Sequence, residues 1–430
     1  MLLSNKKQNV LGKKIAIFIL ILIVGIVLGT IAMTLVYMLP TERMDKNVRS
    51  SIDIMYTELV YPQQVMGYKS SQLDNETDSV MLLSAIFDDT KSSPLEQAMK
   101  VERVVYPSTQ IAGTTGSLVA YAWENQLPTD TVEYSRYWHG YMLWLKPLLL
   151  LLDYADIRML NMMLQLFLLI VLIKKFIDKG MKEYLLPFSM ALIVVNPVAT
   201  AMSMQFSSIY YLVLISMLMI LTYHEKWRSR QWYPYVFFIL GMGTAFFDFL
   251  TYPMAALCMP LLLLLAMNEK EWKEKIVETI ILGICFGTGY VGMWAGKWLV
   301  CSVVVMDTNV LTKVIKQFTL HTGTTQDARG IIYKLEAIWK NVSVLLKWPY
   351  LIFFASVIMF YLRSVNWKNI GKNIQDSIPF LCVGLVPVAW IFFTSSHAYV
   401  CYWYTYRGMM SSVFAAFCIL YKLSFKKKSK

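Results

Sequence analysis

Apolar runs separated by short polar segments follow one another along most of the chain. The first run, from Ile15 to Leu39, has 25 residues, and a helix of that length at about 1.5 Å per residue crosses the roughly 30 Å hydrocarbon core of a membrane. Nine further runs lie at 157–173, 184–201, 206–222, 234–249, 251–267, 276–304, 345–362, 377–394 and 408–421. This pattern predicts an all-α integral membrane protein with about ten transmembrane helices.

The composition excludes a soluble globular protein. Hydrophobic residues make up 57% of the 430 residues and charged residues only 16%, whereas about 25% of the residues in soluble domains are charged. The first apolar run is too long for the core of a signal peptide and carries no A-x-A cleavage site, so we expect it to remain as a membrane anchor.

The distribution of positive charge predicts the orientation of the chain. Lys6, Lys7, Lys13 and Lys14 precede the first run, which places the N-terminus in the cytoplasm, and an even number of spans returns the C-terminus there. The segments assigned to this side carry 22 of the 40 Lys and Arg but only 8 of the 28 Asp and Glu. The net charge of +12 is therefore an orientation signal that faces anionic lipid headgroups, and nucleic acid binding has no support.

The loop lengths predict where the chemistry takes place. We expect a cytoplasmic N-terminus at 1–14, a first transmembrane helix at 15–39, an extracytoplasmic segment at 40–140, a multi-span domain at 141–421 with a second outer loop at 306–345, and a basic cytoplasmic tail at 422–430. The inner connections have only about ten residues each, which leaves no room for a nucleotide-binding domain. Any chemistry should therefore be extracytoplasmic, with a lipid-linked donor.

The strongest local signal is the string LDNETDSVML at 73–82. Asp74 or Asn75 is a good N-cap, so the string predicts a helix start that places Asp74 and Asp78 one turn apart. Two carboxylates so placed can hold a divalent cation, or act as a base and a metal ligand. The alternative is that they only complement the helix dipole.

A second signal, YSRYWHGY at 134–141, closes the large outer segment. Tyr and Trp are expected at this depth as interfacial anchors, but the chain has only four His. His139 is a candidate general base or a hydrogen-bonding partner for a phosphate or a sugar hydroxyl, and Arg136 is a candidate partner for a lipid phosphate.

Ionisable residues inside apolar surroundings give further candidates, because charge at membrane depth is expensive. Asp248 lies in FFDFLTYP between two short runs, where the alternative role is to cap a turn before Pro253. Lys297 lies in WAGKW near the outer end of a long run. It either reaches the interface with its long side chain or places an ammonium against a diphosphate.

The last candidate string is HAYVCYWYTYR at 397–407, which joins the last two runs on the predicted outer side. His397 and Arg407 bracket an aromatic turn that suits stacking on a sugar and binding a phosphate, or else forms an aromatic belt. All the candidate residues come from distant parts of the sequence, yet the predicted topology places them on one side of the membrane.

The layout resembles the GT-C superfamily of integral membrane glycosyltransferases, in which one span, a large outer loop with acidic residues and many further spans follow a cytoplasmic N-terminus. The five strings quoted above also look like those of a group of multi-span proteins from Gram-positive bacteria. The resemblance implies a protein of the bacterial plasma membrane that uses polyprenyl-phosphate-linked sugars on the outer face. GT-C enzymes usually carry an acidic pair shortly after the first span, where this chain has the unpaired Glu42 and Asp45.

The sequence thus leads to a hypothesis of sugar transfer from a polyprenyl-phosphate donor to a glycan, glycolipid or protein of the cell envelope. Asp78 or Asp74 would be the base or a metal ligand, with a divalent cation as the cofactor that such a pair would take, and His139 would assist. The residues expected to bind substrate or phosphate are Arg136, Asp248, Lys297, His397 and Arg407. Two alternatives stay open: a transporter or flippase of lipid-linked saccharides, and a non-catalytic envelope assembly protein.

Overall fold

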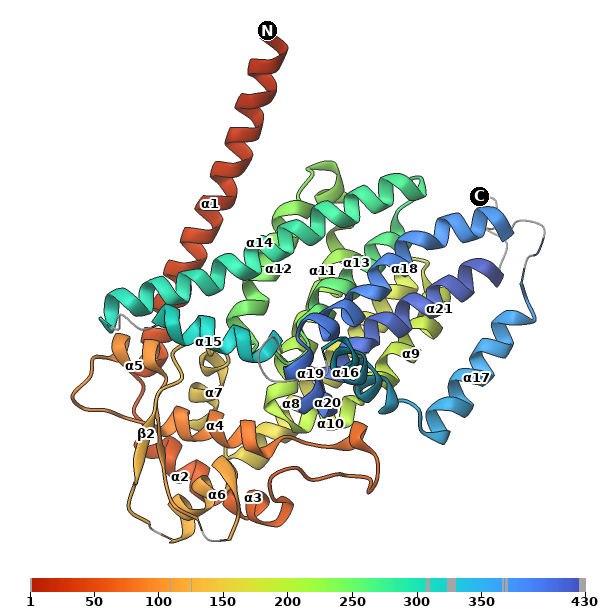
Figure 1. The fold of residues 1–430 in the computed structure, drawn as a ribbon. Helices are drawn as coiled ribbons and strands as arrows, with labels where there is room; N and C mark the ends of the chain where they lie inside the picture. The colour runs from red at the N-terminus through yellow and green to blue at the C-terminus, as the bar shows by residue number, and fades with distance from the viewer. Residues whose placement is uncertain are drawn as a thin grey trace.

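The fold is helical almost throughout in the computed structural model, which describes residues 2–108, 110–124, 126–306, 310–322, 330–365, 367 and 370–424 (Figure 1). The α-helices of the first half are α1 (Leu2–Tyr37), α2 (Glu42–Ser50), α3 (Ile52–Glu58), α4 (Asn75–Ile86), α5 (Pro94–Lys100), α6 (Gly113–Val119), α7 (Met142–Leu149), α8 (Tyr154–Asp178), α9 (Leu185–Val195) and α10 (Pro197–Met202). Those of the second half are α11 (Met204–Ser229), α12 (Tyr233–Phe247), α13 (Met254–Met267), α14 (Trp272–Val304), α15 (Val310–Thr322), α16 (Ile331–Ser343), α17 (Trp348–Leu362), α18 (Ile370–Phe393), α19 (Ser395–Val400), α20 (Tyr402–Thr405) and α21 (Met410–Ser424).

Short elements complete the chain. Within the described residues, single 3₁₀ turns lie at Lys69–Ser71, Lys182–Tyr184 and Tyr406–Met409, and a π-helical turn lies at Ala120–Glu124. Strands β1 (Arg103–Val105) and β2 (Asp130–Val132) pair antiparallel, with Val104 opposite Thr131.

Several helices are long and apolar enough to cross a membrane, which agrees with the prediction of a membrane protein. Among the described residues there are five of them: Gly12–Tyr37 of α1, α8, α11, α14 and α18. The pair α16 and α17, which is bent by 81°, would make a sixth if it is one span.

The predicted count of about ten spans is not supported. Each remaining apolar run does lie in a helix, but α9, α12, α13, α17 and α21 have only 11 to 15 residues. At 1.5 Å per residue these helices are about 17–23 Å long, shorter than a hydrocarbon core of roughly 30 Å. The run at 184–201 is divided because Asn196 adopts a left-handed conformation and its side chain caps α10.

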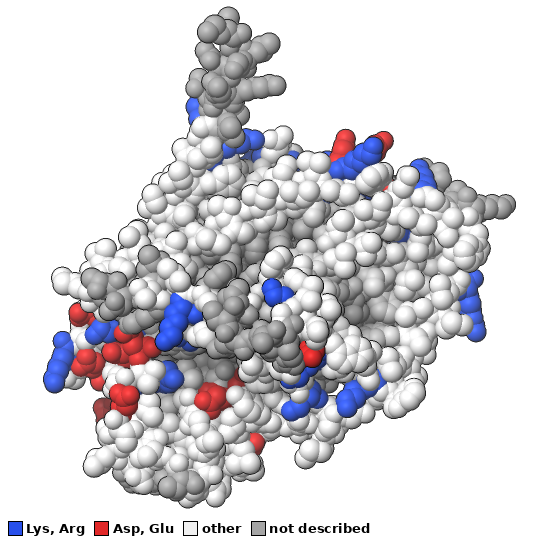
Figure 2. Space-filling model, in the orientation of Figure 1, with Lys and Arg blue, Asp and Glu red and all other residues white. Residues whose placement is uncertain are grey.

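The 40–140 segment forms a lobe of short helices at one end of the molecule, at the lower left of Figure 1, while both chain ends lie in the upper half of that view. Helix α4 is the centre of this lobe, with Met81, Leu82 and Leu83 buried. Figure 2 shows acidic side chains gathered over the lobe, and a largely uncharged band separates them from a second charged area at the top.

Helices α12 and α14 pack with their backbones in close approach. A Cβ atom on Gly241 would overlap the carbonyl oxygen of Phe286, and one on Gly289 would overlap that of Phe238. Small residues at such an interface let van der Waals packing hold apolar helices together where water is absent. This pairing fixes the turn after α12, which carries Asp248, beside the end of the 40–140 segment, whose Gly140 N–H donates to the carbonyl of Phe246 at 2.8 Å.

Candidate functional site

Helix α4 begins where the sequence predicts. Asp74 is its N-cap, and one carboxylate oxygen accepts a hydrogen bond from the backbone N–H of Thr77 at 3.0 Å. The predicted spacing follows from this start, because Asp78 is then one turn further along the helix. Both residues are buried between α4 and the helical bundle.

Asp78 is fully buried and holds the beginning of α11. Its carboxylate accepts hydrogen bonds from the backbone N–H groups of Met204 and Gln205 at 3.0 and 3.1 Å, and from the hydroxyl of Tyr154 at 2.7 Å. Burial raises the pKa of Asp78 above its ordinary value, and these donors and the charge of Arg158 oppose that rise. A carboxylate at a helix N-terminus with three donors is well placed to stabilise the junction of α4 with the bundle.

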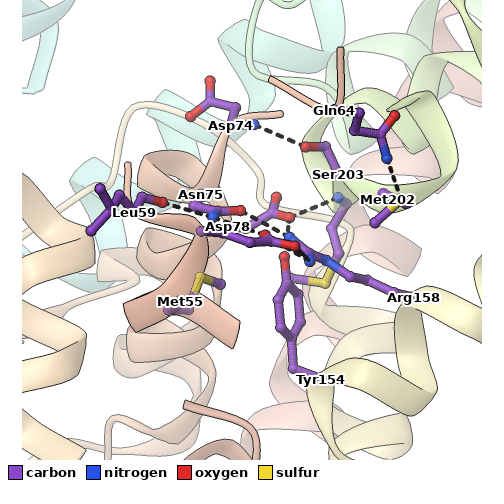
Figure 3. Close-up of polar contacts among 12 residues, drawn as sticks. Met55, Leu59, Gln64, Asp74, Asn75, Asp78, Tyr154, Arg158, Met202 and Ser203 are labelled. Carbon is purple, nitrogen blue, oxygen red and sulfur yellow. Dashed lines mark hydrogen bonds and ion pairs between the residues drawn. The ribbon is translucent and has the colours of Figure 1, made fainter. Parts of the chain in front are cut away.

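A second buried contact reinforces the same junction (Figure 3). Arg158 of α8 donates to both carboxylate oxygens of Glu58 at 2.9 Å and to the side-chain oxygen of Asn75 at 2.8 Å. Asn75 in turn donates to Glu58 and to the carbonyl of Leu59. The 40–140 segment is therefore tied to the bundle by a network of charge-assisted hydrogen bonds, in which Arg158 is the central donor.

Asp74 has different surroundings, although it is only one turn away. Its carboxylate points away from that of Asp78 in Figure 3. Its carboxylate accepts hydrogen bonds from the backbone N–H of Thr77, at 3.0 Å to Oδ1, and from the side chain of the same residue. Burial raises the pKa of Asp74 to about 7. A carboxylate with a pKa near neutrality, held by one neighbouring residue of its own helix, has the properties of a general base.

A metal site on this pair stays a prediction. Within the described ranges, no group of three His, Cys, Asp or Glu side chains is arranged to hold a metal ion. A divalent cation at this position would have only the divergent carboxylates of Asp74 and Asp78 as protein ligands, and the oxygens of Asp78 already accept from a helix N-terminus and a tyrosine.

Asp74 faces the aromatic segment near the end of the chain. Burial is the main cause of the raised pKa values of Cys401 and Tyr404, and the charge of Asp74 adds to both. The hydroxyl of Tyr404 lies 3.4 Å from Nε2 of His397. The candidate residues Asp74 and His397 therefore both lie near Tyr404, which separates them.

His397 also contacts the turn between α12 and α13. Its Nε2 donates to the carbonyl of Leu250 at 2.9 Å, and burial lowers its pKa to about 4. Asp248 caps the same turn, since its carboxylate accepts from the backbone N–H groups of Leu250 and Thr251 and from the hydroxyl of Thr251. Asp248 therefore has the contacts of a residue that caps a turn, which was the alternative role considered for it. The same cap holds the carbonyl of Leu250 in place to accept the hydrogen bond from His397.

His139 lies on the other side of this turn, with its ring centre 5.5 Å from that of Phe249. Its Nε2 lies 2.8 Å from the carbonyl oxygen of Tyr134, which can only accept, so Nδ1 accepts from the hydroxyl of Tyr141 at 3.0 Å. Burial lowers the pKa of His139 to about 3, so the imidazole is neutral at physiological pH. Both ring nitrogens are engaged, which makes His139 a positioning residue for Tyr134 and Tyr141.

Arginine side chains lie over the aromatic rings beside His139. The guanidinium of Arg136 is 4.4 Å from the ring centre of Tyr134, and that of Arg103 is 5.8 Å from the same ring. Both charges contribute to lowering the pKa of His139. The Nε atom of Arg136 is buried without a hydrogen-bond partner. This pair of cations is the positive part of the site.

Burial is the main cause of the lowered pKa of His139, and the charge of Lys297 adds to it, so Lys297 lies near this group. It is fully buried, and its ammonium donates to the carbonyls of Met99 and Ala98 at 2.8 and 3.3 Å, at the C-terminal end of α5. A cation at a helix C-terminus is stabilised by the helix dipole. These contacts occupy Lys297 in joining α14 to the 40–140 segment.

Arg407 is fully buried and lies near Tyr252, which follows the turn at 248–251. Its guanidinium donates to the carbonyls of Trp403 and Val195 at 2.8 and 3.3 Å and lies 3.9 Å from the ring centre of Phe206. The structure thus brings Asp74, Arg136, His139, Asp248 and His397 into one region, and it engages Asp78, Lys297 and Arg407 in contacts with helix ends.

Sequence reasoning missed several residues of this region. Arg158 lies within the predicted apolar run at 157–173. This position could have identified it as a candidate, because an ionisable residue at membrane depth needs a partner. Glu76 accepts from the backbone N–H groups of Thr114 and Thr115 at the start of α6. Arg103 carries no local motif that distinguishes it from other arginines, whereas Tyr404 lies in the aromatic string at 397–407, in which only the flanking His397 and Arg407 were singled out.

No protein family, curated protein or solved structure matches the chain. The fold and the site together define a helical membrane protein with a lobe of short helices docked on its bundle and a polar, aromatic region at the contact between them.

Proposed function

We propose that this protein is an integral membrane glycosyltransferase that moves a sugar from a polyprenyl-phosphate donor to a cell-envelope glycan, glycolipid or protein. The observation that supports this most is Asp74, a buried carboxylate whose hydrogen bonds come from Thr77 and whose pKa is raised to about 7. It lies beside an aromatic segment and at the edge of helices that can cross a membrane.

The transfer step assigns a role to this carboxylate. The acceptor hydroxyl attacks the anomeric carbon of the sugar, and its proton passes to the carboxylate of Asp74. The bond between the anomeric carbon and the phosphate oxygen breaks, and the polyprenyl phosphate leaves with the electron pair. A base whose pKa lies near the operating pH serves this step best.

The cations and rings of the site have complementary roles in this proposal. Arg136 and Arg103 would stabilise the negative charge on the departing phosphate, because fixed cations in a site of low polarity act strongly on developing charge. Tyr134 and Tyr404 would offer apolar ring faces to the sugar. His139 and Asp248 would keep Tyr134 and the turn at 248–251 in position.

A transfer assay tests the proposal. The full-length protein in liposomes is given a pool of labelled polyprenyl-phosphate sugars, and both sugar transfer and donor hydrolysis are measured. We expect activity from the unaltered chain and a loss of about 100-fold or more in Asp74→Asn, as is typical when a general base is removed. Asp88→Asn, which alters an exposed carboxylate in the same segment, is the matched control. Inactivity of the unaltered protein towards every donor would contradict the proposal.

A non-catalytic assembly protein is the second candidate. The contacts of Asp78 and Lys297 favour it, because both residues join the 40–140 segment to the bundle as a structural junction would require. In that case Asp74→Asn would leave the cellular function intact while Asp78→Ala would abolish it.

A further inference from the structure

A groove lies on the molecule far from the candidate site. Its volume is about 740 Å³, and it is bordered by α1, the end of α11, the start of α12 and the first turns of α14. Along α14, Lys273 lies in the groove and Lys297 contacts the 40–140 segment, so 24 residues, or about 36 Å of helix, separate them. That length matches the thickness of a bilayer core, and the groove therefore lies at the opposite membrane interface.

The rim of the groove carries an excess of positive charge. Its cations are Lys14, Arg228, Lys270 and Lys273, and its acids are Glu274 and Glu278. Lys270 is paired with Glu278 at 3.0 Å. In the described part of the chain, no carboxylate lies within ion-pair distance of Lys14, Arg228 or Lys273. Three cations thus remain to meet an anion from outside the chain.

The floor and walls of the groove are apolar. Val277 and Ile281 are 57% and 48% exposed on α14, directly below the charged rim, and Pro234 and Leu282 complete the surface. Tryptophans mark the level of the rim, since Trp232 lies under Lys226 and Arg230, and Trp272 under Lys273. Such a belt is typical of the boundary between headgroups and acyl chains.

We propose that this groove is a binding site for one anionic phospholipid. The phosphate would lie among Lys14, Arg228 and Lys273, and an acyl chain would run along Val277 and Ile281. A soluble phosphate compound would neutralise the cations of the rim but would leave Val277 and Ile281 uncovered. A zwitterionic lipid would cover these two residues but would bring no net negative charge to the cations. Only an anionic lipid matches both parts of the groove.

Native mass spectrometry of the full chain in a mild detergent tests this site. Phosphatidylglycerol and phosphatidylcholine with identical acyl chains are titrated separately. We expect phosphatidylglycerol to bind more tightly, and its affinity to fall about fivefold for each cation removed in Lys14→Gln, Arg228→Gln and Lys273→Gln. Lys179→Gln, an exposed lysine outside the groove, should bind as the unaltered protein does.

A second titration separates a lipid from a soluble ligand. Glycerol phosphate, which has the anionic group but no acyl chain, should not displace phosphatidylglycerol at equal concentration. Displacement by glycerol phosphate would overturn the lipid assignment in favour of a soluble phosphate. A variant that combines Lys14→Gln, Arg228→Gln and Lys273→Gln should bind phosphatidylglycerol far more weakly. If it bound this lipid as tightly as the unaltered protein does, the proposed site would be wrong.

Discussion

Two carboxylates one turn apart at the start of α4 have contrasting surroundings. Asp78 accepts three hydrogen bonds from other elements, two of them from the N-terminus of α11 and one from Tyr154 of α8. Asp74 accepts only from Thr77 of its own helix among the described residues. The contrast shows that the spacing of two acidic residues does not by itself predict a shared metal or catalytic site. The role of each carboxylate depends on the hydrogen-bond donors that the neighbouring helices bring to it.

Other charged side chains near Asp78 also contact the ends of helices. Glu76 meets the N-terminus of α6, while Lys146 and Lys297 donate to carbonyls at the C-terminal ends of α4 and α5. In each case the side-chain charge is opposite to the charge of the helix end. We infer that Lys146 and Lys297 dock the 40–140 segment on the bundle, that Glu76 joins two helices within this segment, and that the region around Asp74 is the part available for chemistry.

The largest expected effect on stability comes from Asp78→Ala. The substitution leaves the N–H groups of Met204 and Gln205 and the hydroxyl of Tyr154 buried without a partner, which should cost about 3 kcal/mol. Thermal unfolding in detergent measures the loss, with Asp88→Asn as the control. An unchanged melting temperature would remove the distinction between the two carboxylates.

Lys297→Met should have a smaller effect of about 2 kcal/mol, because it removes a charge-assisted donor from the carbonyl of Met99 but keeps the volume of the side chain. Lys297→Arg retains the charge and should recover part of the stability. If Lys297→Met were stable but bound the lipid donor more weakly, the residue would belong to the phosphate site instead.

The pH dependence of transfer sharpens the role of Asp74. A base with a pKa of about 7 is mostly protonated at pH 6 and mostly ionised at pH 8, so the rate should rise about tenfold over this range. Rates measured with saturating donor from pH 4 to pH 8 give the profile. A rate that stays constant from pH 8 down to about pH 4, where ordinary carboxylates titrate, would assign the proton transfer to a different group.

The pH dependence of stability isolates His139. Its folded-state pKa of about 3 lies below the ordinary value of 6.5, so its contribution is present above pH 6.5 and is lost as the pH falls towards 3. Between pH 7.5 and 5.5 the loss should be about 1 kcal/mol. His139→Gln should remove this part of the pH dependence, and an identical dependence in the variant would show that another group titrates.

Local sequence patterns predicted the helical class, the apolar runs and the start of α4. The number of spans was not predictable from the runs, because a run does not show where its helix ends; Asn196 and Pro197 divide one run, and Asp248 and Pro253 separate two short helices. An Asn-Pro pair is a breaker signal, and it would have divided the run at 184–201.

The partners of the candidate residues were beyond sequence reasoning. Asp78 contacts backbone N–H groups 126 and 127 positions away, and Lys297 contacts a carbonyl 198 positions away. Backbone groups have the same chemistry at every position, so no residue type marks them. The side chains that carry charge could be identified, but whether they meet a helix end or a substrate depends on the packing of distant elements.

The central claim is that Asp74 acts in chemistry and Asp78 in docking. The most direct test measures sugar transfer and melting temperature together for Asp74→Asn and Asp78→Ala. Asn is also a good N-cap, so Asp74→Asn should keep the melting temperature and lose about 100-fold or more in transfer rate. Asp78→Ala should lower the melting temperature, and its folded fraction should retain transfer. A stable but inactive Asp78→Ala, together with a fully active Asp74→Asn, would contradict the account.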